Sequence, residues 1–262
     1  MGKGMLLTVD VGNTHTVLGL FEGDELKIHW RLTTRREQTA DEYGVLVRNL
    51  FSDSGYAPAD VTGVALASVV PPLTPVLVAL AREYLDHEPL VVEPGVETGM
   101  PILYEPPGDV GADRILNGVA AFDAYGGPVV VVDFGTATTF DVITKKGEYA
   151  GGVICPGIGI SADALFQRAA RLPRVDVRHP GSVIGRSTVT SMQSGLYFGY
   201  VAMCEGIIDR IRDELGEPVR VVATGGLAET LSVEIPAIEA VDPVLTLTGL
   251  RLIWERNQQA TR

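Results

Sequence analysis

The sequence contains little cysteine and no long apolar run. Of its 262 residues only Cys155 and Cys204 are cysteines, and they form neither a CxxC pair nor a metal-ligand spacing. This argues against a disulfide framework or a zinc site and fits a reducing compartment. No apolar run approaches the roughly 20 residues of a membrane span, and the start MGKGMLLTVD lacks the features of a secretory signal. We therefore expect a cytoplasmic protein that does not bind membranes.

Positive charge is also scarce. Lys and Arg number 21 against 33 Asp and Glu, a formal net charge of −12. Such a field repels the phosphate backbone of nucleic acids, so we expect no nucleic acid partner. An anionic small molecule could bind only where backbone amides, an ion or a local arginine make the electrostatic potential positive.

Two common phosphate-binding motifs are absent. Neither GxxxxGK[ST] nor GxGxxG follows any predicted strand, which excludes the P-loop and the Rossmann type of phosphate site. If the protein binds a nucleotide, other turns must hold its phosphates.

The hydrophobic pattern predicts an α/β protein in which one plan occurs twice. In the first half we expect strands at 5–11, 15–21 and 26–33, a helix at 39–54, a strand in 61–72, a helix at 73–85 and a short strand in 89–94. In the second half we expect strands at 128–134, 138–144 and through 149–153, a helix at 188–215, a strand in 219–226 and a final helix from 247.

An Asp-X-Gly turn follows the first strand of each half. The two turns are DVGNTH at 10–15 and DFGTAT at 133–138, so Asp10 and Asp133 stand 123 positions apart, nearly half of the chain. Small residues there leave backbone N–H groups pointing outward, which suits phosphate oxygens. An ordinary hairpin turn uses the same residues and is the better explanation for either turn alone. The repetition behind two buried strands favours phosphate binding.

Two further segments carry candidate residues. Gly225 and Gly226 follow a buried strand and could admit a flat ring, although strand-Gly-Gly-helix is also common in packing. The segment 93–111 is an irregular loop rich in proline and glycine, which favours a functional role. It leads to a helix that we expect to begin at Asp113 and to end at Gly126.

Motifs along almost the whole chain resemble the type III pantothenate kinase family. They are DVGNTHT, SVVPP, GADR, DFGTATT, GGVICPG, LPRVD, IGRST, QSGLYFGY and VATGGLA. The resemblance implies two duplicated actin-like, ribonuclease H-like domains with mixed sheets flanked by helices and a cleft between them. We place these domains at 1–117 and 118–262.

The same resemblance implies an activity. The family phosphorylates the primary hydroxyl of pantothenate with ATP and Mg²⁺, which is the first step of coenzyme A synthesis. Its members are homodimers that need a monovalent cation, K⁺ or NH₄⁺. The family name has also been attached to transcriptional accessory factors, but the acidity of this chain gives direct DNA binding no support.

The resemblance assigns the nucleotide site to the three glycine turns. Asp10 would hold Mg²⁺ indirectly and Asp133 the monovalent cation. Thr139 fits strand packing better than ligand binding, and His15 fits a turn residue better than a catalyst. The implied ATP-binding residues are Asp10, Val11, Gly12, Asn13, Thr14, His15, Thr16, Val17, Gly135, Thr136, Thr138, Gly225 and Gly226.

The resemblance assigns the pantothenate site to the GADR motif and its surroundings. Asp113 would be the catalytic base and Arg114 would bind the substrate carboxylate, whereas the sequence alone favours Asp113 as a helix cap. Thr188 would reach the substrate of the partner subunit, or could cap the long helix. The implied substrate-binding residues are Tyr104, Gly111, Ala112, Asp113, Arg114 and Thr188.

Two other functions share some of these features. A non-catalytic nucleotide-binding regulator would keep the phosphate turns and could lose Asp113 and Arg114, which are both present. A phosphatase or an acetate-type kinase of the same superfamily would share the turns but not GADR beside a Pro-Gly loop. The pattern therefore favours the pantothenate kinase.

Overall fold

The structure is a computed structural model that describes residues 4–260, and it divides into two compact units. Unit 1 contains the described residues up to Ala120 and those from Val244 onward, and unit 2 contains Ala121–Pro243. The division falls within one helix, α3 (Ala112–Tyr125).

Unit 1 is built on a five-stranded mixed sheet of order β3-β2-β1-β4-β5. Its central strand β1 pairs antiparallel with β2 and parallel with β4. Six of the seven residues of β1 are buried because helices cover both faces of the sheet, whereas the edge strand β3 alternates between exposed and half-buried residues. The strands are β1 (Met5–Val11), β2 (His15–Glu22), β3 (Glu25–Thr33), β4 (Val61–Ser68) and β5 (Leu90–Val91).

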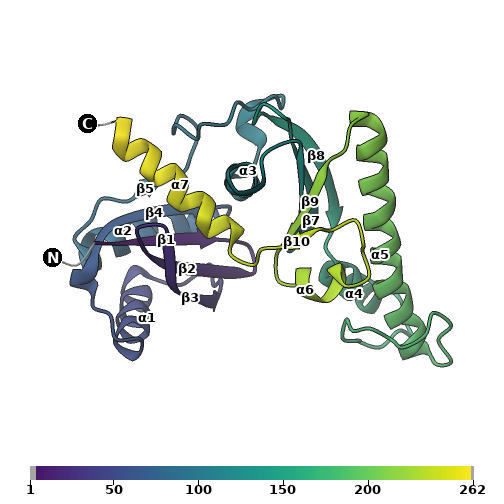
Figure 1. The fold of residues 1–262 in the computed structure, drawn as a ribbon. Helices are drawn as coiled ribbons and strands as arrows, with labels where there is room; N and C mark the ends of the chain where they lie inside the picture. Colours follow the sequence, from purple (N-terminus) through teal and green to yellow (C-terminus); the bar gives the residue numbers. More distant parts are fainter. Residues whose placement is uncertain (1–3, 261–262) are drawn as a thin grey trace. The chain divides into compact units, whose positions relative to one another are not determined.

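Helices form a layer on each face of this sheet (Figure 1). On one face α1 (Ala40–Asp53) and α2 (Thr74–Leu85) contribute Tyr43, Phe51 and Leu77 to the core. On the other face, the first part of α3 and α7 (Leu245–Ala260) contribute apolar side chains, among them Leu116 and Leu250. Short 3-10 helices lie at Pro58–Asp60, Pro71–Leu73 and Pro107–Asp109.

Unit 2 repeats the plan with a sheet of order β10-β9-β6-β7-β8. The central strand β6 pairs antiparallel with β7 and parallel with β9, as β1 does with β2 and β4. Three helices, α4 (Ile158–Arg168), α5 (Thr188–Leu215) and α6 (Ala228–Ser232), share one core with the sheet. The strands are β6 (Val129–Phe134), β7 (Ala137–Ile143), β8 (Tyr149–Pro156), β9 (Arg220–Thr224) and β10 (Ala240–Val241).

The predicted fold class is confirmed, because each half forms a mixed sheet of the same strand order. The predicted domains 1–117 and 118–262 differ from the observed units in two respects: the division falls after Ala120, and α7 belongs to unit 1. The physical reason is its apolar face, on which Leu247, Leu250 and Ile253 pack in one core with Leu6 and Ala65 of the sheet. Helix α4 was not predicted.

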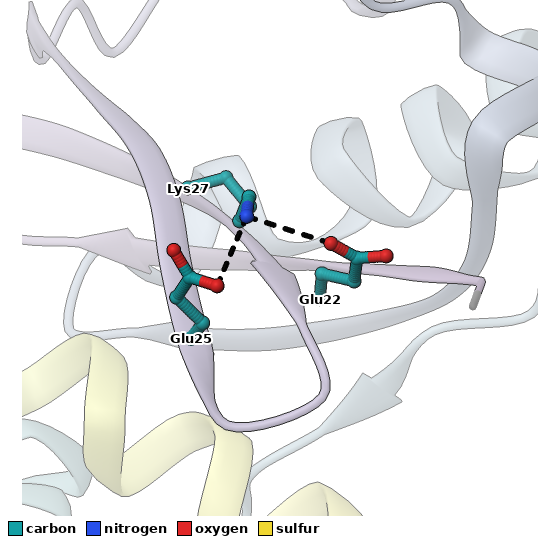
Figure 2. A network of polar contacts seen from close by, with 3 residues as sticks. All are labelled: Glu22, Glu25 and Lys27. Carbon is teal, nitrogen blue, oxygen red and sulfur yellow. Dashed lines mark hydrogen bonds and ion pairs between the residues drawn. The ribbon is translucent and has the colours of Figure 1, made fainter. Parts of the chain in front are cut away.

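Figure 2 shows a polar network of Glu22, Glu25 and Lys27 on β2 and β3. Lys27 Nζ lies 3.5 Å from a Glu22 carboxylate oxygen and 3.0 Å from one of Glu25. Glu22 and Lys27 line an open cavity of about 520 Å³. Glu22 pairs with Met5, at the opposite end of β1 from Asp10, so this cavity is separate from the candidate site.

Among the described residues, none of the helices has the combination of length and apolar content that crossing a bilayer requires.

Candidate functional site

The first Asp-X-Gly turn connects β1 to β2 in unit 1. Asp10 is the penultimate residue of β1 and is half-buried, whereas Asn13 and Thr14 are exposed. The Gly12 N–H donates to the His15 carbonyl at 2.9 Å and closes the turn. A Cβ atom at Gly12 would lie 3.2 Å from the same carbonyl oxygen, so a larger residue would crowd the turn.

Two predicted residues at the start of β2 differ in their surroundings. Thr16 is fully buried, and its hydroxyl lies 3.0 Å from Thr34 Oγ1 and 3.4 Å from Tyr43 Oη. His15 is exposed, and partial burial of its ring together with the charge of Arg31 lowers its pKa.

The second turn connects β6 to β7 in unit 2 and lies beside the paired glycines. Asp133 is the penultimate residue of β6, the same position that Asp10 has in β1. A Cβ atom at Gly135 would lie 3.3 Å from Asp133 Oδ1, and one at Gly225 would lie 2.5 Å from it. Gly225 also has a φ of +93°, a conformation that favours glycine. Two glycine turns therefore approach one carboxylate.

The threonines of the second turn have different accessibilities. Thr136 is exposed, but Thr138 is only 1% exposed. Thr139 Oγ1 donates to Asp141 Oδ2 at 2.9 Å, and Tyr149 Oη donates to Asp141 Oδ1 at 2.6 Å. The hydroxyl proton of Thr139 is thus donated to Asp141 within unit 2, which supports the assignment of Thr139 to strand packing.

The GADR motif begins α3 within unit 1. The Gly111 carbonyl accepts hydrogen bonds from the N–H groups of Arg114 and Ile115, so Gly111 and not Asp113 takes the cap position. Asp113 Oδ1 accepts a bond from the Arg114 N–H at 2.9 Å. A Cβ atom at Gly111 would lie 2.5 Å from that oxygen.

The electrostatics of this motif suit a proton acceptor beside an anion site. Burial raises the pKa of Asp113, and the hydrogen bond and charge of Arg114 reduce the rise. A raised carboxyl pKa makes a stronger base, closer to the pH at which an enzyme works. Arg114 is 8% exposed, and a guanidinium can bind a carboxylate through two hydrogen bonds.

Helix α7 packs against the helix that carries this motif. The sequence did not predict this contact. Thr246 Oγ1 donates to Asn117 Oδ1 at 2.8 Å, one turn after Asp113. A Cβ atom at Gly249 would lie 2.2 Å from the Leu116 carbonyl oxygen, so α3 and α7 can approach this closely only with glycine there. The available signal was a glycine inside a helical pattern, which often marks close packing.

The remaining predicted residues lie in a loop and at a helix start. Tyr104 is half-buried in the loop that ends at Gly111. Thr188 is the first residue of α5 and is exposed. The cap of α5 is Ser187, whose hydroxyl accepts the Thr190 N–H, so Thr188 is not the cap.

Within the described part of the chain, no three or more His, Cys, Asp or Glu side chains gather as a metal site. Asp10 and Asp133 each lie beside a turn with exposed residues. This arrangement suits Mg²⁺ bound with a nucleotide, because Mg²⁺ commonly takes one or two carboxylates and fills its other positions with phosphate oxygens and water.

The duplicated sheets with an Asp-X-Gly turn at each central strand define a two-lobed, actin-like kinase fold. Solved structures of this shape include a candidate Baf family transcriptional activator from Campylobacter jejuni, with a TM-score of 0.61 and 19% identity, covering 97% of this chain and 99% of that chain. A candidate 2-dehydro-3-deoxygalactonokinase from Sinorhizobium meliloti has a TM-score of 0.58 and 15% identity, covering 96% of each chain. At these identities the similarity shows the fold alone.

Sequence comparison is more specific. The model of the type III pantothenate kinase family matches residues 6–210. A protein of Moorella thermoacetica named type III pantothenate kinase is 56% identical over 253 residues, covering 97% of this chain and all of that protein. The chain belongs to the type III pantothenate kinase family.

Proposed function

We propose that this protein transfers the γ-phosphoryl group of ATP to the primary hydroxyl of pantothenate, giving 4'-phosphopantothenate for coenzyme A synthesis. The observation that carries the proposal is the pair at the start of α3. A carboxylate with a raised pKa stands next to a buried arginine, in a chain of this family. A proton acceptor and a carboxylate receptor are the two groups that pantothenate requires.

The glycine turns would bind the nucleotide. Phosphoryl transfer depends chiefly on positioning and on neutralising charge at the transferring group. Backbone N–H groups at Gly12–Thr14 and at Gly135–Thr136 would donate to phosphate oxygens, Asp10 would hold Mg²⁺ through water, and the flat base would lie against Gly225 and Gly226. Thr16 and Thr138 are buried, and each would support the nucleotide site from the start of the strand that follows its turn.

Asp133 would hold a monovalent cation. Glycines at 135 and 225 keep Cβ atoms away from this carboxylate, since a Cβ atom would lie 3.3 Å or 2.5 Å from its Oδ1 atom. Without a cation, this carboxylate and the polyphosphate would repel each other. K⁺ or NH₄⁺ at this position would remove the repulsion.

The reaction itself would use Asp113 and Arg114. Asp113 would take the proton from the pantothenate hydroxyl as its oxygen attacks the γ-phosphorus, and Arg114 would hold the substrate carboxylate. Tyr104, Gly111 and Ala112 would line the same pocket. The bond between the γ-phosphorus and the oxygen that bridges to the β-phosphate would break, and ADP would leave with that oxygen.

Release of ADP is the test. The wild-type protein should release ADP from Mg-ATP only when pantothenate is present, and faster with K⁺ or NH₄⁺ than with Na⁺. ADP release without pantothenate would contradict the proposed substrate. Equal rates in Na⁺ and K⁺ would contradict only the role of Asp133.

We further propose a cytoplasmic homodimer in which α5 packs against its copy. Small residues follow one face of α5 at helical spacing, namely Thr188, Ser191, Gly195, Gly199 and Ala202, and all are exposed. A Cβ atom at Gly195 or Gly199 would meet no atom within 4 Å. A partner helix could therefore pack closely on this face, and Thr188 at its end would then reach the partner.

Two exposed apolar side chains lie in the segment that leads into α5. Val183 is 67% exposed and Ile184 82%. Exposed apolar groups of this size often mark a protein interface. Sedimentation at micromolar concentration should give twice the mass of the chain, and a monomer would contradict the proposal.

A further inference from the structure

One residue outside the two Asp-X-Gly turns contacts the turn of unit 1 at both ends. Thr34 directly follows β3, and its hydroxyl donates to the Gly12 carbonyl at 2.8 Å. Its backbone N–H donates to the Thr14 carbonyl at 3.0 Å. Thr34 therefore holds two of the three residues that connect β1 to β2.

The Thr34 hydroxyl is also the last member of a chain of hydroxyls. Its single proton is used on Gly12, so the 3.0 Å contact with Thr16 requires the Thr16 hydroxyl to donate to Thr34. Thr16 has then used its own proton, and the 3.4 Å contact with Tyr43 requires the Tyr43 hydroxyl to donate. All three bonds run in one direction, from the buried Tyr43 of α1 to the turn.

This series of hydrogen bonds changes the charge distribution of the turn as well as holding its shape. Hydrogen bonds in series polarise one another, so each bond is stronger than it would be alone. The Gly12 carbonyl shares a peptide group with the Asn13 N–H. A hydrogen bond to the carbonyl makes that N–H more positive and fixes the direction in which it points.

The equivalent position in unit 2 supports a role for Thr34. Gly157 directly follows β8, and its N–H donates to the Thr136 carbonyl at 3.1 Å, as the Thr34 N–H does to Thr14. A Cβ atom at Gly157 would lie 2.2 Å from that carbonyl oxygen and 2.7 Å from the Gly135 carbonyl oxygen. In unit 2 the backbone alone packs against the turn, whereas in unit 1 a side-chain hydroxyl takes this place.

We propose that Thr34 is a positioning residue for nucleotide binding, which orients the Gly12–Asn13 peptide so that its N–H can donate to a phosphate oxygen. The inference rests on the proposed function, because it takes the turn to bind ATP. Tyr43 and Thr16 act through Thr34.

Substitution of Thr34 by Val tests the inference, since Val keeps the shape and removes the hydroxyl. The dissociation constant of Mg-ATP, measured by calorimetry, should rise about threefold to tenfold, the effect of one net hydrogen bond. The KM for pantothenate should stay unchanged. Thr34→Ser restores the hydroxyl and should restore ATP binding.

Thr8→Val is the matched control. Thr8 lies in the same sheet, is fully buried, and donates its hydroxyl to the Gly19 carbonyl at 3.1 Å, away from the turn. It should lower thermal stability at least as much as Thr34→Val and leave ATP affinity unchanged. If ATP binds more weakly to both variants, the effect comes from a general loss of stability, and the inference is overturned.

The outcomes separate the two proposals. Unchanged ATP affinity in Thr34→Val overturns the role of Thr34 alone. A wild-type protein that binds ATP without phosphorylating pantothenate overturns the proposed function, while the Thr34 comparison still decides the inference. A wild-type protein that does not bind ATP overturns both.

Discussion

Asp113 combines a raised pKa with a position in the first turn of a helix, which makes its role testable by a single substitution. Asp113→Asn removes the proton acceptor and keeps the shape of the side chain. A general base contributes about 10²- to 10⁴-fold, so kcat should fall by about that factor while the dissociation constant of ATP changes little. Near-normal turnover would show that Asp113 has only a structural role.

The same substitution should stabilise the protein in a pH-dependent way. The pKa of Asp113 is higher in the folded than in the unfolded chain, because burial disfavours the charge. The folded state therefore binds this proton more tightly, and wild-type stability falls as the pH rises from the unfolded pKa through the folded one. Asn carries no proton to lose in this range.

Urea unfolding at several pH values measures this effect. At pH 7 Asp113→Asn should be more stable than the wild type, and the difference should shrink toward pH 3.5. Asp109→Asn is the control, since Asp109 is exposed in the 3-10 helix that precedes α3. A variant that is less stable than the wild type at pH 7 would mean that loss of the charge interaction with Arg114 outweighs the relief of burial.

At the scale of elements, most of the secondary structure could be predicted from the sequence. The helix expected at 188–215 matches α5, and the strand expected at 5–11 matches β1. The signal for β1 is the apolar run before Asp-X-Gly. For α5 the sequence offered Thr188 as the cap, one residue after the observed cap Ser187. Helix α4 has a weaker signal, because Ile160, Leu165 and Phe166 are exposed and its apolar residues do not mark one buried face.

The candidate site was predictable only in part, for a physical reason. Motifs indicate which residues lie at the turns, but the partner of a side chain depends on strand register. The bond from Thr34 to Gly12 joins residues 22 positions apart, and the bond from Thr246 to Asn117 joins residues 129 positions apart. A threonine near a strand end or in a helix gives no local sign of either bond.

The start of α5 offers a comparison of two neighbouring hydroxyls. Ser187 caps the helix, and loss of a cap costs about 0.5–2 kcal/mol, so Ser187→Ala should lower the melting temperature. Thr188 makes no capping bond and is exposed. Thr188→Ala should leave the melting temperature unchanged and raise the KM for pantothenate. A lower melting temperature for Thr188→Ala with normal KM would contradict the proposed substrate contact.

At the scale of the whole molecule, the chain order does not follow the two compact units. The chain leaves unit 1 within α3, builds unit 2, and returns at Val244 so that α7 completes the core of unit 1. Hydrophobic periodicity predicts that α7 is a helix, but not which sheet its apolar face will cover. A truncation before Val244 should therefore expose Leu6 and Leu116 of unit 1 and leave the core of unit 2 covered.

Subunit exchange tests the proposed dimer, because each site would take Asp113 from one chain and Thr188 from the other. Asp113→Asn and Thr188→Ala homodimers would each be impaired at both sites. In a mixed dimer one site would lack both groups, while the other would carry both wild-type groups. Activity after subunit exchange should exceed the sum of the two parents in proportion to the fraction of mixed dimers.

Exchange must be shown independently, for example by native mass measurement of differently tagged chains. A double variant, Asp113→Asn with Thr188→Ala, mixed with the wild type is the matched control. Each site of that mixed dimer would lack one group, so its activity should fall below the average of the parents. If mixed dimers form in the first experiment and no activity returns, Thr188 acts within its own chain, and the exposed face of α5 serves assembly without completing the site.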